Sequence, residues 1–213
     1  SKKKLLNYVV CKEQQLNLNK TKNEIDKYYN LKQWDKIKKF TNPYEMIYIT
    51  NKKRRQFSVS LYEPLSRSYF KMLEMSKEFL QDIIKKENAI KSVHLAEGPG
   101  GFIEGIVNIR KNKNDIYYGM TLKDTNKEIP GWRRSKDFLN KNPNVRIVYG
   151  FDKTGNLYNI ENHKYLQYLI GCNKVDFVTG DGGFDFSVDY NLQEFLANKL
   201  IFAQIIGAFS VLK

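Results

Sequence analysis

Cysteine and histidine are scarce in this sequence of 213 residues, which has two residues of each. The two cysteines, Cys11 and Cys172, lie far apart, so a disulfide framework is not expected and a reducing compartment fits. His94 and His163 are not at metal-ligand spacing, so we expect neither a zinc site nor another metal site. These features predict an intracellular protein, either cytoplasmic or nuclear.

Long apolar segments are also lacking. No run approaches the roughly 18 residues that a membrane-spanning helix needs. The opening Ser1-Lys2-Lys3-Lys4 leads into no hydrophobic core of the signal-peptide type. Neither a membrane-spanning nor a secreted protein is therefore expected.

Basic residues are in clear excess. Lys and Arg total 36 against 23 Asp and Glu, which gives a formal net charge of +13. Residues 1–60 alone carry a net +10, whereas the remaining 153 residues carry only +3. Such an excess favours a polyanionic partner, either nucleic acid or an anionic membrane, and it does not choose between them.

Short apolar runs alternate with longer helical or polar stretches along the chain. We expect helices at residues 22–40, 66–88, 103–110 and 192–213, and strands at residues 92–96, 116–120, 145–149 and 175–179. This alternation predicts an α/β domain with a mainly parallel sheet and right-handed crossovers. We expect residues 1–42 to form a basic, largely helical extension and residues 43–213 to form the domain.

The most informative segment is a glycine-rich turn that follows the first expected strand, Glu97-Gly98-Pro99-Gly100-Gly101-Phe102. Glycines let the backbone approach a ligand closely, and open α/β sheets bind ligands at the carboxyl ends of their strands. The turn matches neither the G-x-G-x-x-G fingerprint nor the G-x-x-x-x-G-K-[ST] phosphate loop. It therefore favours a bulky cofactor that is not held by its phosphates, with a purely structural connection as the alternative.

The residues Gly98-Pro99-Gly100-Gly101-Phe102 resemble the S-adenosylmethionine turn of the FtsJ-like ribose 2′-O-methyltransferases. Five further blocks resemble the family, or its mRNA cap branch, in the same order: Thr41–Glu45, Arg67-x-x-x-Lys71-Met72, Gly119–Lys123 (which includes Leu122), Thr154–Leu157 with Glu161-Asn162, and Asp181–Phe184 with Asn191 and Gln193-Glu194. The resemblance covers about residues 41–213. It implies a Rossmann-like methyltransferase fold with S-adenosylmethionine as cofactor.

The family also implies a catalytic Lys-Asp-Lys-Glu tetrad. Carried over by position, Lys71 matches the first lysine and Asp181 matches the aspartate. The resemblance places the second lysine on the strand after the last helix and the glutamate later still, so neither has a counterpart in a sequence that ends at Lys213. Lys213 itself falls too early after that helix to be the second lysine. We therefore expect a domain truncated at its C-terminal end, with four strands and an unpaired edge.

Two positions of the cofactor site depart from the family pattern, and a third position, Glu97, has two alternative roles. His94 stands where the family has an acidic residue at the end of the first strand. Glu97 offers a carboxylate three positions later, which either takes the methionine amino group or caps the following helix. Asn156 replaces the usual aspartate near the adenine, and its amide oxygen can still accept a hydrogen bond from the adenine amino group.

The chemistry needs a group that activates a ribose 2′-hydroxyl, because a hydroxyl is a poor nucleophile until its proton is removed or its alkoxide is stabilised. A lysine can do this when burial, a second lysine and the sulfonium charge lower its pKa. Lys71 lies on an apolar helix between Phe70 and Met72, a setting that favours such burial. We expect Asp181 to orient the lysines.

The resemblance implies methylation of a ribose 2′-hydroxyl in the 5′ cap region of mRNA, with capped RNA as substrate. Because the matching blocks lie in the part of the chain that is nearly charge-balanced, a membrane partner is not expected. Single-stranded RNA is held by basic grooves and aromatic side chains. The candidates are the aromatic residues Tyr62 and Trp132 and the basic residues Lys52, Lys53, Arg54, Arg55, Arg133 and Arg134.

Two alternatives remain from the sequence. One is a ribose 2′-O-methyltransferase of rRNA or tRNA, and the other is a non-catalytic RNA-binding subunit that stimulates a partner enzyme. The abundance of Lys, Asn and Ile is typical of AT-rich genomes and suggests a viral origin, with action in the host cytoplasm. The sequence names no protein partner.

Overall fold

The structure is a computed structural model of the 213-residue chain. It describes residues 11–31, 33–34, 37, 41–42, 46–49, 57–123, 131–172, 174–183 and 193–213. Two compact units are distinguished, Ser1–Glu63 with Phe184–Ala197 and Pro64–Gly183 with Asn198–Lys213. The expected division at residue 42 stays a prediction.

The first unit contains helix α2 (Lys12–Asn30), which has no buried residue. The expected bounds, 22–40, are wrong, because the helix begins at Lys12 and is capped by Leu31. Apolar spacing could not mark this start, since the first turns of α2 are almost entirely polar. Lys52, Lys53, Arg54 and Arg55 lie outside the described residues.

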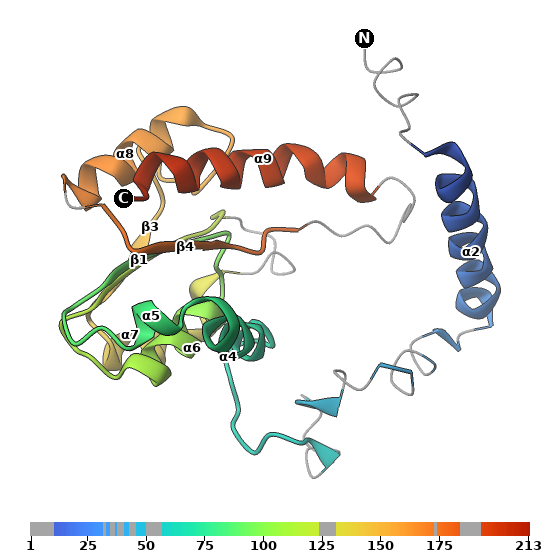
Figure 1. The fold of residues 1–213 in the computed structure, drawn as a ribbon, viewed down its shortest axis with the longest axis horizontal. Helices are drawn as coiled ribbons and strands as arrows, with labels where there is room; N and C mark the ends of the chain where they lie inside the picture. Colours follow the sequence, from blue (N-terminus) through green and yellow to red (C-terminus); the bar gives the residue numbers. More distant parts are fainter. Residues whose placement is uncertain are drawn as a thin grey trace. The chain divides into compact units, whose positions relative to one another are not determined.

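Four parallel strands form the sheet of the second unit: β1 (Lys91–Leu95), β2 (Ile116–Met120), β3 (Val145–Val148) and β4 (Phe177–Gly180). Their order is β3-β2-β1-β4, so β1 and β4 flank the point where the strand order reverses (Figure 1). The predicted α/β class with a parallel sheet is confirmed. In open parallel sheets, the crevice at this switch point, beyond the carboxyl ends of the strands, is where ligands bind.

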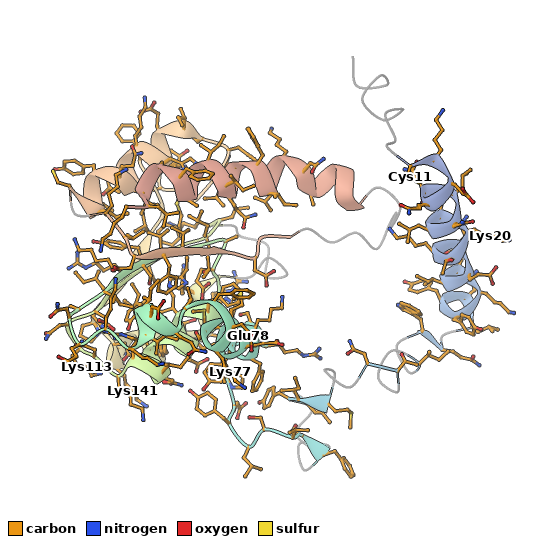
Figure 2. All side chains as sticks on the ribbon, viewed as in Figure 1. Cys11, Lys20, Lys77, Glu78, Lys113 and Lys141 are labelled. Atoms are coloured by element: carbon orange, nitrogen blue, oxygen red, sulfur yellow. The ribbon has the colours of Figure 1, made fainter. Side chains whose placement is uncertain are left out.

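Helices cover both faces of this sheet (Figure 1). One face carries α4 (Ser68–Phe79), α5 (Gln81–Ile84), α6 (Gly101–Arg110), η3 (Trp132–Arg134) and α7 (Lys136–Lys141). The other face carries α8 (Ile160–Ile170) and α9 (Gln193–Val211). Charged side chains such as Lys77, Glu78, Lys113 and Lys141 point outward from this unit (Figure 2). Within the described part of the chain, no helix is both long and apolar enough to cross a membrane.

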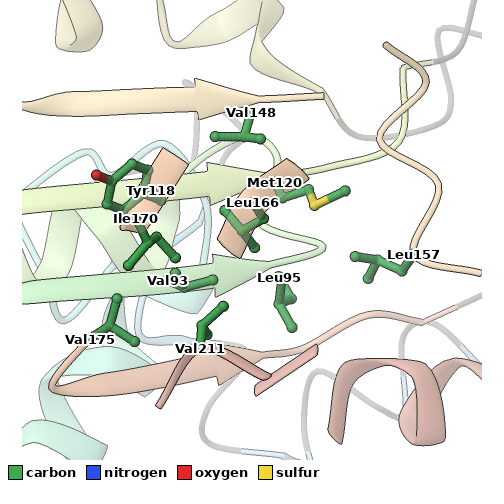
Figure 3. Close-up of a cluster of buried hydrophobic side chains, with 10 residues drawn as sticks. All are labelled: Val93, Leu95, Tyr118, Met120, Val148, Leu157, Leu166, Ile170, Val175 and Val211. Carbon is green, nitrogen blue, oxygen red and sulfur yellow. The ribbon is translucent and has the colours of Figure 1, made fainter. Parts of the chain in front are cut away.

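Alternating strand residues build two separate cores, one on each face of the sheet. The core beneath α8 and α9 consists of Val93, Leu95, Tyr118, Met120, Val148, Leu157, Leu166, Ile170, Val175 and Val211 (Figure 3). The core beneath α4 and α6 consists of Met72, Ile90, Phe102, Ile103, Ile106, Tyr117, Trp132, Val145 and Phe177. Burial of both faces favours continuous apolar runs, and β2 has such a sequence, whereas β1 also buries the polar residues Ser92 and His94.

Two expectations about element ends need correction. The single helix expected at 66–88 is broken at Leu80, whose φ of −117° and ψ of 17° separate α4 from α5. The outer edge of β4 is not wholly unpaired, because Leu212 forms a parallel bridge with Val175 just before that strand. Lys213 pairs with Asp176 at 2.7 Å, at the amino end of β4 and thus at the opposite end of the strand from Asp181.

His94 is a fully buried histidine in the middle of the sheet. Its Nε2 atom lies 2.8 Å from Ser92 Oγ, its Nδ1 atom lies 2.7 Å from Thr179 Oγ1, and its ring packs edge-on against Phe177. Burial lowers the pKa of His94 from 6.5 to about 3. His94 is therefore a neutral core residue, and it does not take over the role of the acidic residue that the family has at this position.

We expect His94 to make the protein less stable as the pH falls from about 6.5 towards 3. In that range the unfolded chain binds a proton on His94 that the folded chain does not, which costs at most about 1.4 kcal/mol per pH unit. Urea unfolding at several pH values should show that the free energy of unfolding of His94→Gln falls less steeply over this range. Identical slopes for the two proteins would contradict this prediction.

Candidate functional site

The glycine turn joins β1 to α6 at the carboxyl edge of the sheet. Gly100 has φ +110°, a left-handed conformation that residues with a side chain rarely adopt, and it caps the amino end of α6. A Cβ atom on Gly100 would also lie 3.0 Å from the ring of Trp132. The position therefore requires glycine for its backbone and for its space. Gly98 and Pro99 are half-buried, so part of the turn remains accessible beside β1.

Glu97 faces the beginning of α6. Its side chain is buried, and Oε1 accepts a hydrogen bond from the backbone N–H of Ile103 at 3.0 Å. Two roles were considered for Glu97, and these contacts correspond to capping of α6. Burial raises the pKa of Glu97 to about 8, against the lowering effect of the Ile103 and Phe102 amides, and the charge of Asp181 adds to the increase.

We expect Glu97 to make the protein less stable as the pH rises from about 4.5 to 8. The unfolded chain releases the Glu97 proton in this range whereas the folded chain retains it, at a cost of at most about 1.4 kcal/mol per pH unit. Glu97→Gln keeps a hydrogen-bond acceptor without the titrating proton. Chemical unfolding at pH 5, 6, 7 and 8 should show less loss of stability for this variant than for the parent protein, and a parallel decline would count against the assignment.

Close packing of α4 against α6 places Lys71 at the site. Met72 is fully buried, and a Cβ on Gly105 would lie only 2.8 Å from Met72 Cβ, so the two helices come this close because Gly105 has no side chain. Glu104 accepts a hydrogen bond from the Leu65 backbone N–H at 2.8 Å, which holds the chain just before α4. With Met72 turned towards α6, Lys71 lies on the outer side of the helix.

Lys71 and Asp181 form an ion pair across the carboxyl edge of the sheet. The Lys71 Nζ atom donates to Asp181 Oδ2 at 2.6 Å, although the two residues are 110 positions apart in the sequence. Asp181 directly follows β4, and the next residue, Gly182, donates its backbone N–H to Gln204 Oε1 at 2.9 Å. The structure thus brings together the two side chains predicted to be catalytic.

The burial expected around Lys71 is not what the structure shows. The side chains of Lys71 and Asp181 are 58% and 48% exposed. An ion pair this exposed contributes about 0–1 kcal/mol to stability. The pair is therefore of little structural value, and both groups remain accessible to a ligand at the sheet edge.

At the carboxyl edge of the sheet, the loops after β2 and β3 lie on the side away from β4. The backbone N–H of Lys123 donates to Thr154 O at 2.7 Å, and Gly155 packs directly on the Thr121 carbonyl, where a Cβ would overlap it. Leu122 is 41% exposed and offers an apolar surface there. Asn156 Oδ1 accepts a hydrogen bond from the Tyr158 backbone N–H at 2.9 Å, so the amide oxygen predicted to meet adenine also holds a local turn.

The glycine turn is also held by contacts from residues 132–135, which the sequence did not predict. The ring of Trp132 is buried between Gly100 and Gly119, so it does not offer the exposed aromatic surface for RNA that was expected. The hydroxyl of Ser135 donates to the Pro99 carbonyl. No sequence pattern links residues 132–135 to a turn at residues 97–101, since the contact depends on how η3 folds back on the sheet. Arg133 and Arg134, predicted to bind RNA, are exposed on the same short helix.

Metal ligands do not cluster in the described residues: no three His, Cys, Asp or Glu side chains lie where they could hold an ion together. The described side chains at this edge include an accessible lysine–carboxylate pair beside the glycine turn.

Comparisons with known proteins bear on this arrangement. A family model described as FtsJ-like methyltransferase matches residues 64–213. Cap-specific mRNA (nucleoside-2′-O-)-methyltransferase 1 of Drosophila melanogaster is 26% identical over 136 residues, which cover 62% of this chain and 17% of the relative. The protein of the same name from Mus musculus is 30% identical over 186 residues, which cover 81% of this chain and 21% of the relative.

A solved structure titled as a ribosomal RNA methyltransferase from Plasmodium falciparum aligns with a TM-score of 0.45 and 17% identity, covering 70% of this chain and 72% of that one. The chain spans about a fifth of the length of the two animal relatives that it matches.

Proposed function

The chain belongs to the FtsJ-like methyltransferase family, and from this premise we propose that it methylates a ribose 2′-hydroxyl in the 5′ cap region of mRNA with S-adenosylmethionine as methyl donor. The observation that carries the proposal is the Lys71–Asp181 ion pair of 2.6 Å, which joins α4 to the end of β4 beside the glycine turn. The names of the animal relatives support the cap as substrate.

The residues at the carboxyl edge fit the proposed cofactor. Gly98, Pro99, Gly100, Gly101 and Phe102 supply a turn whose backbone lies beside β1, and Gly100 leaves no side chain over it. Leu122 and Asn156 lie on the loops after β2 and β3, and would border the adenine. Glu97 supports the turn from behind by binding the amide of Ile103. When bound, S-adenosylmethionine supplies an electrophilic methyl group.

Lys71 and Asp181 have complementary parts in this proposal. Lys71 Nζ donates a hydrogen bond to the ribose 2′-oxygen and stabilises the negative charge that develops there as the hydroxyl proton passes to solvent water. Asp181 holds the lysine ammonium in place through Oδ2. Positioning of the hydroxyl by these two groups supplies a large part of the rate.

The proposed RNA surface consists of basic residues around the same edge. Lys123, Arg133, Arg134 and Lys199 are exposed on the loops and helices that follow the strands, and Lys199 Nζ lies 4.4 Å from the ring centroid of Tyr158. A positive rim with an exposed aromatic ring is typical of surfaces that bind single-stranded RNA. The basic extension, residues 1–42, and the Lys52–Arg55 run belong to the other unit, and their part in RNA binding stays a prediction.

The test compares methyl transfer to short capped and uncapped RNAs of the same sequence, with mass spectrometry of the digested product to locate the methyl group. We expect a 2′-O-methyl nucleotide next to the cap and a much slower reaction on uncapped RNA. Equal rates on both RNAs would instead indicate the rRNA or tRNA branch. Tight RNA binding without any transfer would indicate the non-catalytic subunit.

A further inference from the structure

Arg133 and Arg134 lie between two residues that both touch the glycine turn. On one side, the ring of Trp132 fills the space above Gly100. On the other side, the hydroxyl of Ser135 donates to the Pro99 carbonyl, and Ser135 is fully buried. The two arginines therefore stand on a short segment, residues 132–135, that is fastened to the turn at both ends. We call these four residues the arginine segment.

The Trp132 ring is held by close packing against two glycines. A Cβ on Gly100 would lie 3.0 Å from its Cζ3 atom, and a Cβ on Gly119 would lie 2.6 Å from its Cη2 atom and 2.9 Å from the Ile103 side chain. The Nε1 atom of Trp132 is buried and has no hydrogen-bond partner among the residues that the structure describes. The ring thus lies against the turn and β2, and it belongs to the same buried cluster as Ile103 of α6.

We propose that RNA bound at Arg133 and Arg134 and cofactor bound at the glycine turn strengthen each other's binding through the docking of the arginine segment. This inference rests on the proposed function, since it takes RNA and S-adenosylmethionine as the two ligands. It adds that the two ligands bind cooperatively and names Trp132 and Ser135 as the positioning residues that couple them.

The physical argument is a linkage between two sites that share one element. When the arginine segment is docked, both guanidinium groups project from one short helix and the turn is held in its cofactor-binding form. When the segment is undocked, the arginines lose their common position and the turn loses the Trp132 ring. A ligand that favours the docked form lowers the cost of ordering it for the second ligand. Couplings of this kind typically change affinity by about 5- to 150-fold, equally in both directions.

The test measures the dissociation constant of S-adenosylhomocysteine, which cannot donate a methyl group, by calorimetry with and without a saturating short capped RNA. We expect at least about fivefold tighter binding with RNA, and the same factor for RNA binding with and without S-adenosylhomocysteine. Equal affinities with and without RNA would overturn the coupling while leaving the proposed function intact. Absence of S-adenosylhomocysteine binding under both conditions would instead overturn the proposed function and this inference with it.

Two variants locate the coupling. The surface variant Arg133→Gln/Arg134→Gln should weaken RNA binding and reduce the coupling factor towards one, whereas the charge-matched control Lys136→Gln/Lys141→Gln, on exposed positions of the adjacent α7, should keep it. Trp132→Leu should bind both ligands separately but with a coupling factor near one. An unchanged coupling factor in Arg133→Gln/Arg134→Gln would overturn the inference even if Trp132→Leu does not fold.

Discussion

Replacing Lys71 with alanine is expected to slow methyl transfer by about 10²- to 10³-fold, the usual range for losing a donor that stabilises developing negative charge. The reason is the position of its ammonium group, 2.6 Å from Asp181 Oδ2 at the edge where the glycine turn ends. Transfer of a labelled methyl group to capped RNA at saturating cofactor measures the effect.

Binding and stability should change little in Lys71→Ala. The ion pair is about half exposed, so its loss should alter the free energy of unfolding by about 1 kcal/mol or less. Lys77→Ala is the matched control, because Lys77 is an exposed lysine on the same helix and points to solvent (Figure 2). Normal transfer by Lys71→Ala, or an equal loss in Lys77→Ala, would remove Lys71 from the proposed chemistry.

Arg110→Ala is expected to produce the largest loss of stability, about 3–5 kcal/mol, which is a large part of the stability of an ordinary domain. The Arg110 side chain is 3% exposed and that of Asp115 is 0% exposed. Two nearly parallel hydrogen bonds of 2.9 and 3.0 Å join the guanidinium to the carboxylate. Arg110 also donates to the carbonyls of Ile84 and Asn88.

The loss of stability in Arg110→Ala arises because its partner Asp115 remains buried without a counter-charge. Burial by itself would raise the pKa of Asp115, but the bonds from Arg110, the Ile90 amide and Tyr117 hold it below its ordinary value, so the carboxylate stays charged in the core. Without Arg110 that charge is buried and uncompensated. Adding Asp115→Asn should therefore recover part of the loss, whereas Lys141→Ala, on an exposed position, should change stability by less than about 0.5 kcal/mol. Urea unfolding of the four proteins measures these differences, and a loss below about 1 kcal/mol in Arg110→Ala would contradict the account.

Helix and strand positions were predicted well wherever the signal was local. The strand at 116–120 was predicted with the bounds that β2 has, and the last helix was predicted within two residues of α9. The break at Leu80 was missed because Leu80, Ile83 and Ile84 continue the apolar spacing of α4 and pack against the same core. Spacing reports which side of a helix is buried, and it does not report where the backbone bends.

For the candidate site too, the residues carried by local motifs were predicted, whereas contacts between distant segments were not. Lys71, Asp181 and the glycine turn were named from short motifs, and their roles stay predictions. The sequence left two roles open for Glu97, and its contact with the Ile103 amide, six residues later, favours the helix cap. That Trp132 supports Gly100 depends on a contact between segments distant in the chain. This second contact leaves no periodic or compositional trace, so the sequence does not predict it.

The sequence by itself determined the parallel α/β architecture, the place of the turn and the excess of positive charge, because periodicity, glycine placement and composition are local properties of the chain. Only the tertiary structure decided that Lys71 and Asp181 meet at 2.6 Å and that the lysine is exposed. That meeting requires α4 to lie against α6 at Gly105 and β4 to lie beside β1. It is a consequence of packing, which is fixed only when the whole sheet and its helices assemble.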